Sequence, residues 1–183
     1  MNDATVTELK PRNTKRRVVL ISGMSGAGLS SVLKSLEDLG YEAVDNLRLS
    51  MVPTLIRGST KNNKPLAISV DSRNAEFNAE MFLRYVGEFK LDQHLDTRLL
   101  FLDCDDEALL RRFNETRRRH PLAGDRPVKE GIALERKMLA PVQEAADHTI
   151  DTSLLSAHDL RRLLVGHYRT DNSGLTISVS PFS

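Results

Sequence analysis

The sequence predicts an α/β protein in which a parallel sheet of about five strands carries helices on both faces. Short apolar runs rich in β-branched residues alternate along the chain with longer segments of helical periodicity. Such alternation is expected when parallel strands are joined by crossover helices. Polar or glycine-rich segments directly follow most of the apolar runs. In parallel sheets the carboxyl ends of the strands share one edge, where ligands bind, so one shared site is expected there.

The composition is that of an ordinary globular domain. The 183 residues are 40% apolar and 28% charged, with a net charge of +1, so no global field favours nucleic acid or membrane as a partner. Cys104 is the one cysteine, which excludes an intrachain disulfide and fits a reducing compartment. No segment approaches the roughly 18 apolar residues of a membrane span. We therefore expect a cytoplasmic protein with no membrane partner.

The first predicted strand is the apolar run at 18–21, which is typical of a strand buried on both faces. A glycine-rich turn follows it, and apolar residues at helical spacing then predict a helix that ends at Gly40. Residues 41–44 form the second predicted strand. A short amphipathic segment at 49–57 leads into a turn rich in polar residues.

The apolar runs at 66–70 and 99–102 predict the third and fourth strands. An aromatic stripe at 77–89 lies between them, and its helical spacing predicts a core-facing helix. The next predicted helix includes residues 108–113 and runs into a basic segment.

The last third of the chain predicts a helix at 132–146, with a break or kink at Pro141. A fifth strand is expected at 148–150, and Ser156 to Asp159 resembles a capping box that opens a last helix. By this division, residues 1–16 form a disordered leader and 17–170 form the domain. Residues 171–183 form a linker and the first strand of a C-terminal domain that the sequence lacks.

The turn after the first strand is almost the phosphate-binding pattern G-x-x-x-x-G-K-[ST], the P-loop. Its glycines let successive N–H groups and the following helix N-terminus converge on a phosphate. The lysine position holds Leu29, so the backbone cradle is retained while its charge is lost. A glycine turn with no ligand is the alternative. The predicted nucleotide-binding residues are Gly23, Met24, Ser25, Gly26, Ala27, Gly28, Leu29 and Ser30.

A site of this kind also predicts Mg²⁺, held by a hydroxyl and a carboxylate at the end of a strand. Ser30 supplies the hydroxyl. Asp71 and Asp103 both follow apolar runs, and Asp71 is preferred because the strand nearest the P-loop strand usually carries this residue. A turn aspartate at the end of a strand is the alternative for either. The histidines lack metal-ligand spacing, so no zinc site is expected.

The most basic stretch includes Arg117, Arg118 and Arg119, followed by His120. In small P-loop kinases arginines after such a helix close over the phosphates, so these three are candidate lid residues. A solvated basic face and a surface that touches RNA phosphate are the alternatives. For His120, beside Pro121, the alternatives are a group that switches its protonation state and a turn histidine, and we favour the turn histidine.

Together these motifs resemble the RNase adapter protein RapZ family of bacterial P-loop nucleotide-binding proteins. The resemblance runs in unbroken order from about Arg17 to Arg162. The segments that carry it are Gly23–Gly28, Leu36–Tyr41, Val44–Leu47, Asp71–Asn74, Phe101–Asp103, Glu115–Leu122, Ile150–Ser153 and His158–Arg161.

The resemblance implies a kinase-like P-loop domain that binds ATP or GTP and hydrolyses it weakly. It assigns the ATP phosphates to Gly23–Ser30, and it assigns a guanine-nucleotide role to Asp71, Ser72, Arg73 and Asn74. Some members act as RNA-binding adapters through a second, C-terminal domain. We expect this chain to end where that domain begins, so RNA or protein partners are expected only through the missing domain. Leu29 departs from the family pattern and predicts reduced affinity and, at most, weak ATPase or GTPase activity.

Three hypotheses follow. The leading one is a nucleotide-binding regulatory domain. The second is a small-molecule kinase, favoured by the strand pattern and the arginines. The third is a domain that kept the fold, lost the nucleotide and serves in protein or RNA contacts, as Leu29 suggests. The sequence leaves a homo-oligomer open.

Overall fold

Five parallel strands form one sheet in a computed structural model that describes residues 15–58 and 63–169. The order of the strands across the sheet is β2-β3-β1-β4-β5, which confirms the predicted fold class. The strands are β1 (Arg16–Gly23), β2 (Glu42–Val44), β3 (Leu66–Ser69), β4 (Leu95–Asp103) and β5 (His148–Asp151).

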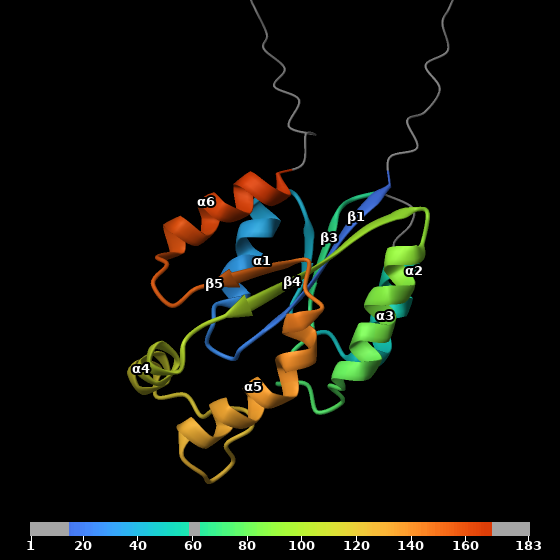
Figure 1. The fold of residues 1–183 in the computed structure, drawn as a ribbon. Coiled ribbons are helices and arrows are strands. Elements are labelled where there is room, and N and C mark those ends of the chain that lie inside the picture. The colour runs from blue at the N-terminus through green and yellow to red at the C-terminus, as the bar shows by residue number, and fades with distance from the viewer. Residues whose placement is uncertain (1–14, 59–62, 170–183) are drawn as a thin grey trace, which may run out of the picture.

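The helices cover both faces of this sheet, as Figure 1 shows. Helices α1 and α6 lie on one face, whereas α2 and α3 lie on the other. Helices α4 and α5 lie near the edge where the strands end. The helical elements are α1 (Leu29–Asp38), the short 3₁₀ helix η1 (Leu49–Met51), α2 (Val52–Gly58), α3 (Ala79–Leu91), α4 (Asp106–Thr116), α5 (Val128–Glu144) and α6 (Ala157–Tyr168).

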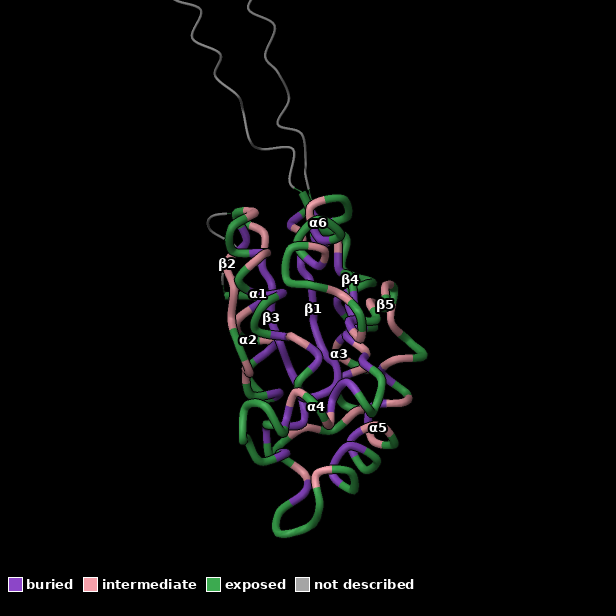
Figure 2. Tube along the Cα trace, turned by 90° about the vertical axis from the view of Figure 1, so that its left-hand side faces the viewer, coloured by how far each residue is buried: buried purple, intermediate pink, exposed green. Residues whose placement is uncertain are grey.

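The core lies on the central strands, which are buried along most of their length (Figure 2). Every residue of β3 is buried, and so are the apolar residues of β1. The register sets Ile21 opposite Ser69 and Gly23 opposite Leu102. The ends of β1, β3 and β4 therefore meet at one edge of the sheet, which positions the glycine-rich turn beside the residues that follow the other two strands.

Some boundaries differ from the sequence prediction. Arg16, assigned to the leader, begins β1, and its guanidinium donates to the carbonyls of Lys64 and Ile56 at 2.7 and 3.2 Å. Helix α5 begins at Val128 and continues through Pro141, so no break occurs there. The predicted strand after residue 174 and residues 1–14 of the leader lie outside the described residues.

Other local predictions are confirmed. Ser156 caps α6, and Asp159 completes the capping box by accepting from the Ser156 backbone N–H. Within the described ranges, no helix is long and apolar enough to cross a membrane.

Candidate functional site

The glycine-rich loop joins the end of β1 to the first turn of α1. The Met24 N–H donates to the Leu102 carbonyl at 3.0 Å, and a Cβ on Gly23 would lie 2.4 Å from that carbonyl oxygen. Gly26 and Gly28 have φ angles of +89° and +106°, in the left-handed region that favours glycine. The loop therefore has a shape that depends on its glycines.

The first turn of α1 presents its backbone N–H groups at the end of this loop. Gly28 is the N-cap residue and supplies no side-chain cap, and no acidic residue lies in the first turn. The first N–H groups of a helix have no partner within the helix, and the helix dipole adds positive potential there. Ser30 is exposed at the second helical position. This arrangement is suited to an anion such as a phosphate.

Leu29, in the lysine position, is part of the hydrophobic core. It is the first residue of α1 and is 6% exposed. Leu160 of α6 comes close to the same segment, because its Cδ2 would lie 4.0 Å from a Cβ on Gly28. The leucine therefore stabilises the packing of α1 and supplies no charge to a phosphate.

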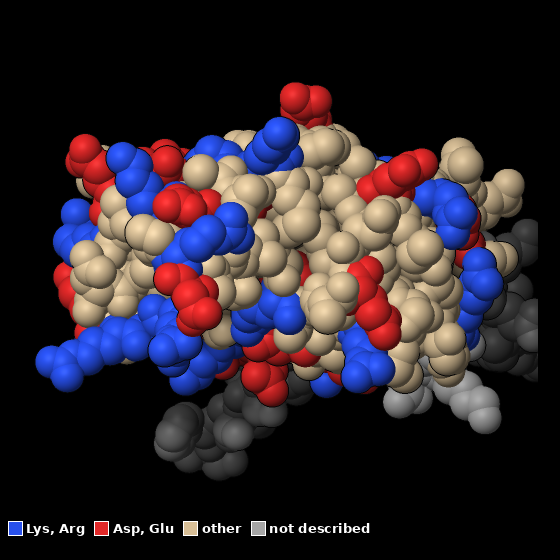
Figure 3. Space-filling model, turned by 90° about the horizontal axis from the view of Figure 1, so that it is seen from below, with Lys and Arg blue, Asp and Glu red and all other residues tan. Residues whose placement is uncertain are grey.

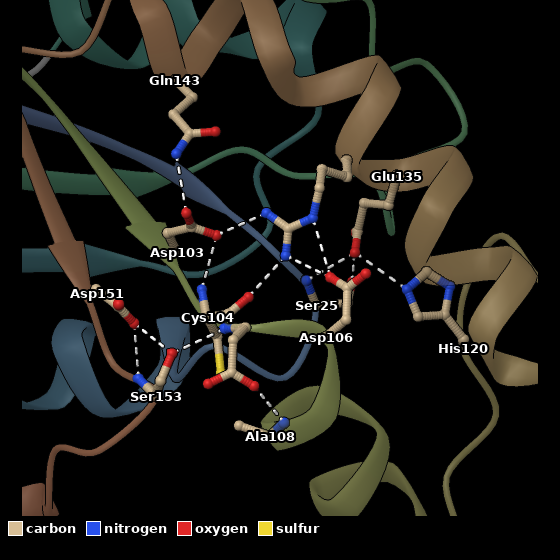
Figure 4. A network of polar contacts seen from close by, with 12 residues as sticks. Ser25, Asp103, Cys104, Asp106, Ala108, His120, Glu135, Gln143, Asp151 and Ser153 are labelled. Atoms are coloured by element: carbon tan, nitrogen blue, oxygen red, sulfur yellow. Dashed lines mark hydrogen bonds and ion pairs between the residues drawn. The ribbon is translucent and has the colours of Figure 1, made fainter.

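A buried carboxylate lies against the same loop. Glu135 of α5 is fully buried, and its Oε2 accepts the Ser25 N–H at 2.9 Å while its Oε1 accepts the Ser25 hydroxyl at 2.7 Å. Oε1 also accepts the Ser72 hydroxyl, and Oε2 lies 3.0 Å from His120 Nε2. We call these four residues the Glu135 cluster; Figure 4 shows Glu135 between Ser25 and His120. The cluster ties the glycine loop to the end of β3 and to the segment before α5.

The position of the proton in this cluster follows from the histidine. His120 Nδ1 accepts the Leu122 N–H at 3.1 Å, so a neutral ring carries its proton on Nε2 and donates it to Glu135. The ring packs on Phe113 with centroids 5.1 Å apart. A Cβ on Gly131 would lie 2.6 Å from Nδ1, so glycine makes room for the ring. His120, interpreted from the sequence as a turn histidine, is therefore a buried partner of Glu135.

The cluster keeps Glu135 ionised. Burial alone would raise the pKa of this carboxyl, but hydrogen bonds from His120, Ser72 and Ser25 outweigh burial and hold its pKa below the usual range. The glycine loop thus lies beside a fixed negative charge.

We expect acid to remove the stability that this carboxylate provides. Its pKa is depressed in the folded state, so its contribution is complete above the unfolded pKa of about 4.3 and is lost as the pH falls through the folded pKa. Urea unfolding from pH 7 to pH 3 should show the wild type losing its advantage over Glu135→Gln as the pH falls. Parallel curves for the two proteins would contradict this result.

Sequence reasoning did not select Glu135, although the sequence contained a signal. Ile132, Glu135, Leu139 and Val142 all lie on the buried face of α5. A carboxylate at a core position of a helical stripe requires a buried partner. The partner, Ser25, lies 110 residues away in the chain, so local patterns could not identify it.

The segment Asp71–Asn74 follows β3, as predicted, but its side chains have separate roles. Asp71 is fully buried, and both of its carboxylate oxygens accept from Arg73, at 2.8 Å from Nε and 2.7 Å from Nη2. Arg73 also donates to Asp45 at 2.8 Å, which joins the segments after β2 and β3. Ser72 belongs to the Glu135 cluster, and Asn74 donates to the Leu47 carbonyl at 3.1 Å. Asp71 therefore presents no open carboxylate in this structure.

Asp103, the alternative carboxylate, binds side chains of α5 (Figure 4). Its two oxygens accept from Arg136 at 2.9 Å and from Gln143 at 2.9 Å. Arg136 also pairs with Asp106 at 2.7 Å. These bonds fix α5 against the end of β4, which in turn positions Glu135 one residue before Arg136.

Arg112 of α4 contacts the glycine loop. It donates to the Gly26 carbonyl at 3.0 Å and to the Thr152 carbonyl at 2.6 Å. Thr152, at the end of β5, is buried, and its hydroxyl donates to the Ala27 carbonyl at 2.8 Å. The contact with Gly26 joins residues 86 positions apart in the chain, so no local pattern indicates it.

The candidate lid residues Arg117, Arg118 and Arg119 lie in the segment between α4 and α5, and all three are exposed. Arg119 lies 4.0 Å from Asp125, a contact between two exposed side chains. Acidic and basic groups are interspersed on the face seen in Figure 3, where no single sign of charge predominates. A cavity of about 230 Å³ is lined by Arg119, His120, Ala123, Gly124, Asp125, Arg126 and Val128.

The strand order and the glycine loop between β1 and α1 define a class of protein, the kinase-like P-loop fold. A shikimate kinase from Acinetobacter baumannii has a similar fold, with a TM-score of 0.56 and 20% identity over 84% of this chain and 92% of that one. The YorR protein of Bacillus subtilis, solved with phosphorylated GDP, is also similar, with a TM-score of 0.55 and 10% identity over 81% and 94% of the two chains.

Within this class the chain belongs to the RapZ-like N-terminal domain family, whose model matches residues 16–172. This match confirms the resemblance found in the sequence. A nucleotide-binding protein of Rhodospirillum centenum is 52% identical over 94% of this chain and 52% of its own length. Another from Zymomonas mobilis is 44% identical over 86% of this chain and 50% of its own length. The chain thus spans about half the length of these relatives.

Proposed function

We propose that this chain binds ATP or GTP at Gly23–Ser30 and acts as a regulatory domain with weak or lost hydrolysis. The observation that carries the proposal is the backbone of the glycine loop. Its glycines have positive φ angles, and the loop ends at the uncapped N-terminus of α1, where backbone N–H groups can bind a phosphate. Relatives named nucleotide-binding proteins support it. A cytoplasmic location is part of the proposal and is supported by the single cysteine.

We also propose that Mg²⁺ accompanies the nucleotide. The exposed Ser30 fits a role in holding it, because a hydroxyl at this helical position is a hard oxygen ligand beside the phosphates. Asp71 fits less well, because it is buried and paired with Arg73. Among the described residues, no group of three or more metal-ligating side chains forms a site by itself. Most of the ligands would therefore come from the nucleotide and water.

Weak or lost hydrolysis follows from the charges at the loop. Phosphoryl transfer needs positively charged groups beside the terminal phosphate, because negative charge develops on that phosphate in the transition state. Leu29 supplies none and is buried. Where the family resemblance implies RNA or protein contacts, we propose them for the C-terminal domain of the longer family members and not for residues 17–170 of this chain.

We expect Leu29→Lys to raise ATP and GTP affinity by at least about tenfold, because one charge-assisted contact contributes about 1.5–3 kcal/mol. Lysine can keep its aliphatic stem on the core while its ammonium group reaches the loop. Calorimetric titration with each nucleotide and Mg²⁺ measures the change. Leu91→Lys adds the same charge at the exposed last residue of α3, beside the start of β4 and so at the opposite edge of the sheet from the loop, and should leave affinity unchanged.

The same titration tests the proposed function. No binding by wild type at millimolar nucleotide, and no gain with Leu29→Lys, would contradict it. That outcome would favour a domain that kept the fold and lost the nucleotide, a reading supported by the burial of Leu29 in the core.

A further inference from the structure

We infer that the site takes nucleoside diphosphates in preference to triphosphates, and that Glu135 determines this specificity. The inference rests on the proposed function, since it concerns the ligand of the same loop. It begins from the contact between the Glu135 carboxylate and the Ser25 N–H, 2.9 Å apart.

In that contact the Ser25 N–H, a backbone donor of the glycine loop, is bonded to a carboxylate of the protein itself. The Ser25 hydroxyl donates to the same carboxylate at 2.7 Å, and the Ser25 side chain is itself buried. The carboxylate thus accepts the hydrogen bond that the Ser25 N–H would otherwise donate to a phosphate oxygen. An incoming phosphate at that point meets a negative charge where the loop would normally present a donor.

The phosphate chain of a nucleotide has a direction along such a loop. The N–H groups next to the helix hold the α- and β-phosphates, and the lysine position reaches toward the β- and γ-phosphates. Residues 28–30 are at the helix end, whereas Ser25 lies toward the β1 end. With the first two phosphates on the N–H groups that begin α1, where a helix has no partner of its own for them, a third phosphate extends toward Ser25 and Glu135.

Two changes of charge act on that third phosphate together. Leu29 removes a positive charge at the lysine position, and Glu135 adds a negative charge that is fully buried and poorly screened. Arg112 keeps its positive charge, but the N–H groups that it directs to the carbonyls of Gly26 and Thr152 are not available as donors to a third phosphate. The negative charge of a third phosphate therefore meets less positive charge from the protein than the charges of the first two phosphates. A diphosphate should bind more tightly than a triphosphate.

The test compares ADP with ATP, and GDP with GTP, by calorimetric titration of the full 183-residue chain with Mg²⁺. We expect the diphosphate to bind at least about tenfold more tightly, a difference of about 1.4 kcal/mol. This comparison uses the wild-type protein, so it does not depend on the folding of any variant.

Glu135→Gln then tests the residue. The carboxamide oxygen can accept the Ser25 and His120 N–H groups, and its NH₂ group faces the hydroxyls of Ser25 and Ser72, which can act as acceptors. The variant should bind triphosphate more tightly and shrink the preference toward unity. Glu144→Gln removes an exposed charge from the same helix and should keep the wild-type preference.

The outcomes separate the two proposals. Binding of neither diphosphate nor triphosphate overturns the proposed function, and the inference with it. Equal or tighter binding of triphosphate by wild type overturns the inference and leaves the proposed function intact. A diphosphate preference that Glu135→Gln does not reduce overturns the role of Glu135.

Discussion

Glu135→Ala is expected to lower the free energy of unfolding by about 2–6 kcal/mol, because it removes the buried acceptor of two N–H groups. The substitution leaves the Ser25 N–H and the His120 Nε2–H buried without an acceptor, and each unpaired donor costs about 1–3 kcal/mol. The two hydroxyls can turn toward each other, since Ser25 Oγ and Ser72 Oγ already lie 3.4 Å apart. Urea unfolding followed by circular dichroism measures the change.

The matched control is Glu144→Ala, which removes an exposed carboxylate from the last turn of the same helix. We expect its free energy of unfolding to stay within about 0.5 kcal/mol of wild type. An equal, small change in both variants would show that the buried carboxylate does not hold α5 to the glycine loop.

The sheet and the glycine loop could be predicted because their signals are local. The apolar run of β1, the spacing of Gly23 and Gly28, and the capping box at Ser156 each lie within a few residues. Such patterns can be recognised without knowledge of any tertiary contact. The resemblance extended them to the whole domain, and the family match confirms it.

The polar partners could not be predicted, because they join segments distant in the chain. Glu135 reaches Ser25 across 110 residues and Arg112 reaches Gly26 across 86. The choice between Asp71 and Asp103 as the carboxylate for Mg²⁺ also depended on which distant side chains each one contacts. Each aspartate ends a strand, yet Asp71 pairs with Arg73 and Asp103 with Arg136. A sequence shows which carboxylates end strands, but tertiary packing decides which remain open to a ligand.

Arg16 illustrates the same limit for a boundary. Its charge suggested a solvated leader, but its guanidinium donates to the Lys64 and Ile56 carbonyls while the residue is 4% exposed. Arginine can bury its stem when carbonyls satisfy its head. Charge alone was therefore a poor guide to the start of β1.

Gly23→Ala is expected to have the largest effect of any change within the glycine loop. Gly23 lies opposite Leu102 in the pairing of β1 with β4, and a Cβ would lie 2.4 Å from the Leu102 carbonyl oxygen and 2.8 Å from its Cβ. Backbone atoms of a central strand cannot yield as a side chain can. We expect a loss of at least about 3 kcal/mol in the free energy of unfolding, the upper range for overpacking, measured by urea unfolding.

The matched control is Gly87→Ala, which makes the same chemical change on an open helical face. Gly87 lies inside α3 and is exposed, and apart from its chain neighbours and the backbone of its own helix no atom lies within 4 Å of the position of an added Cβ. Alanine is about 1 kcal/mol better than glycine in a helix interior, so this variant should be more stable than wild type. The two substitutions should thus shift the urea midpoint in opposite directions. A Gly23→Ala protein as stable as wild type would mean that β1 and β4 can separate at the loop, and the fixed geometry on which the phosphate cradle depends would be lost.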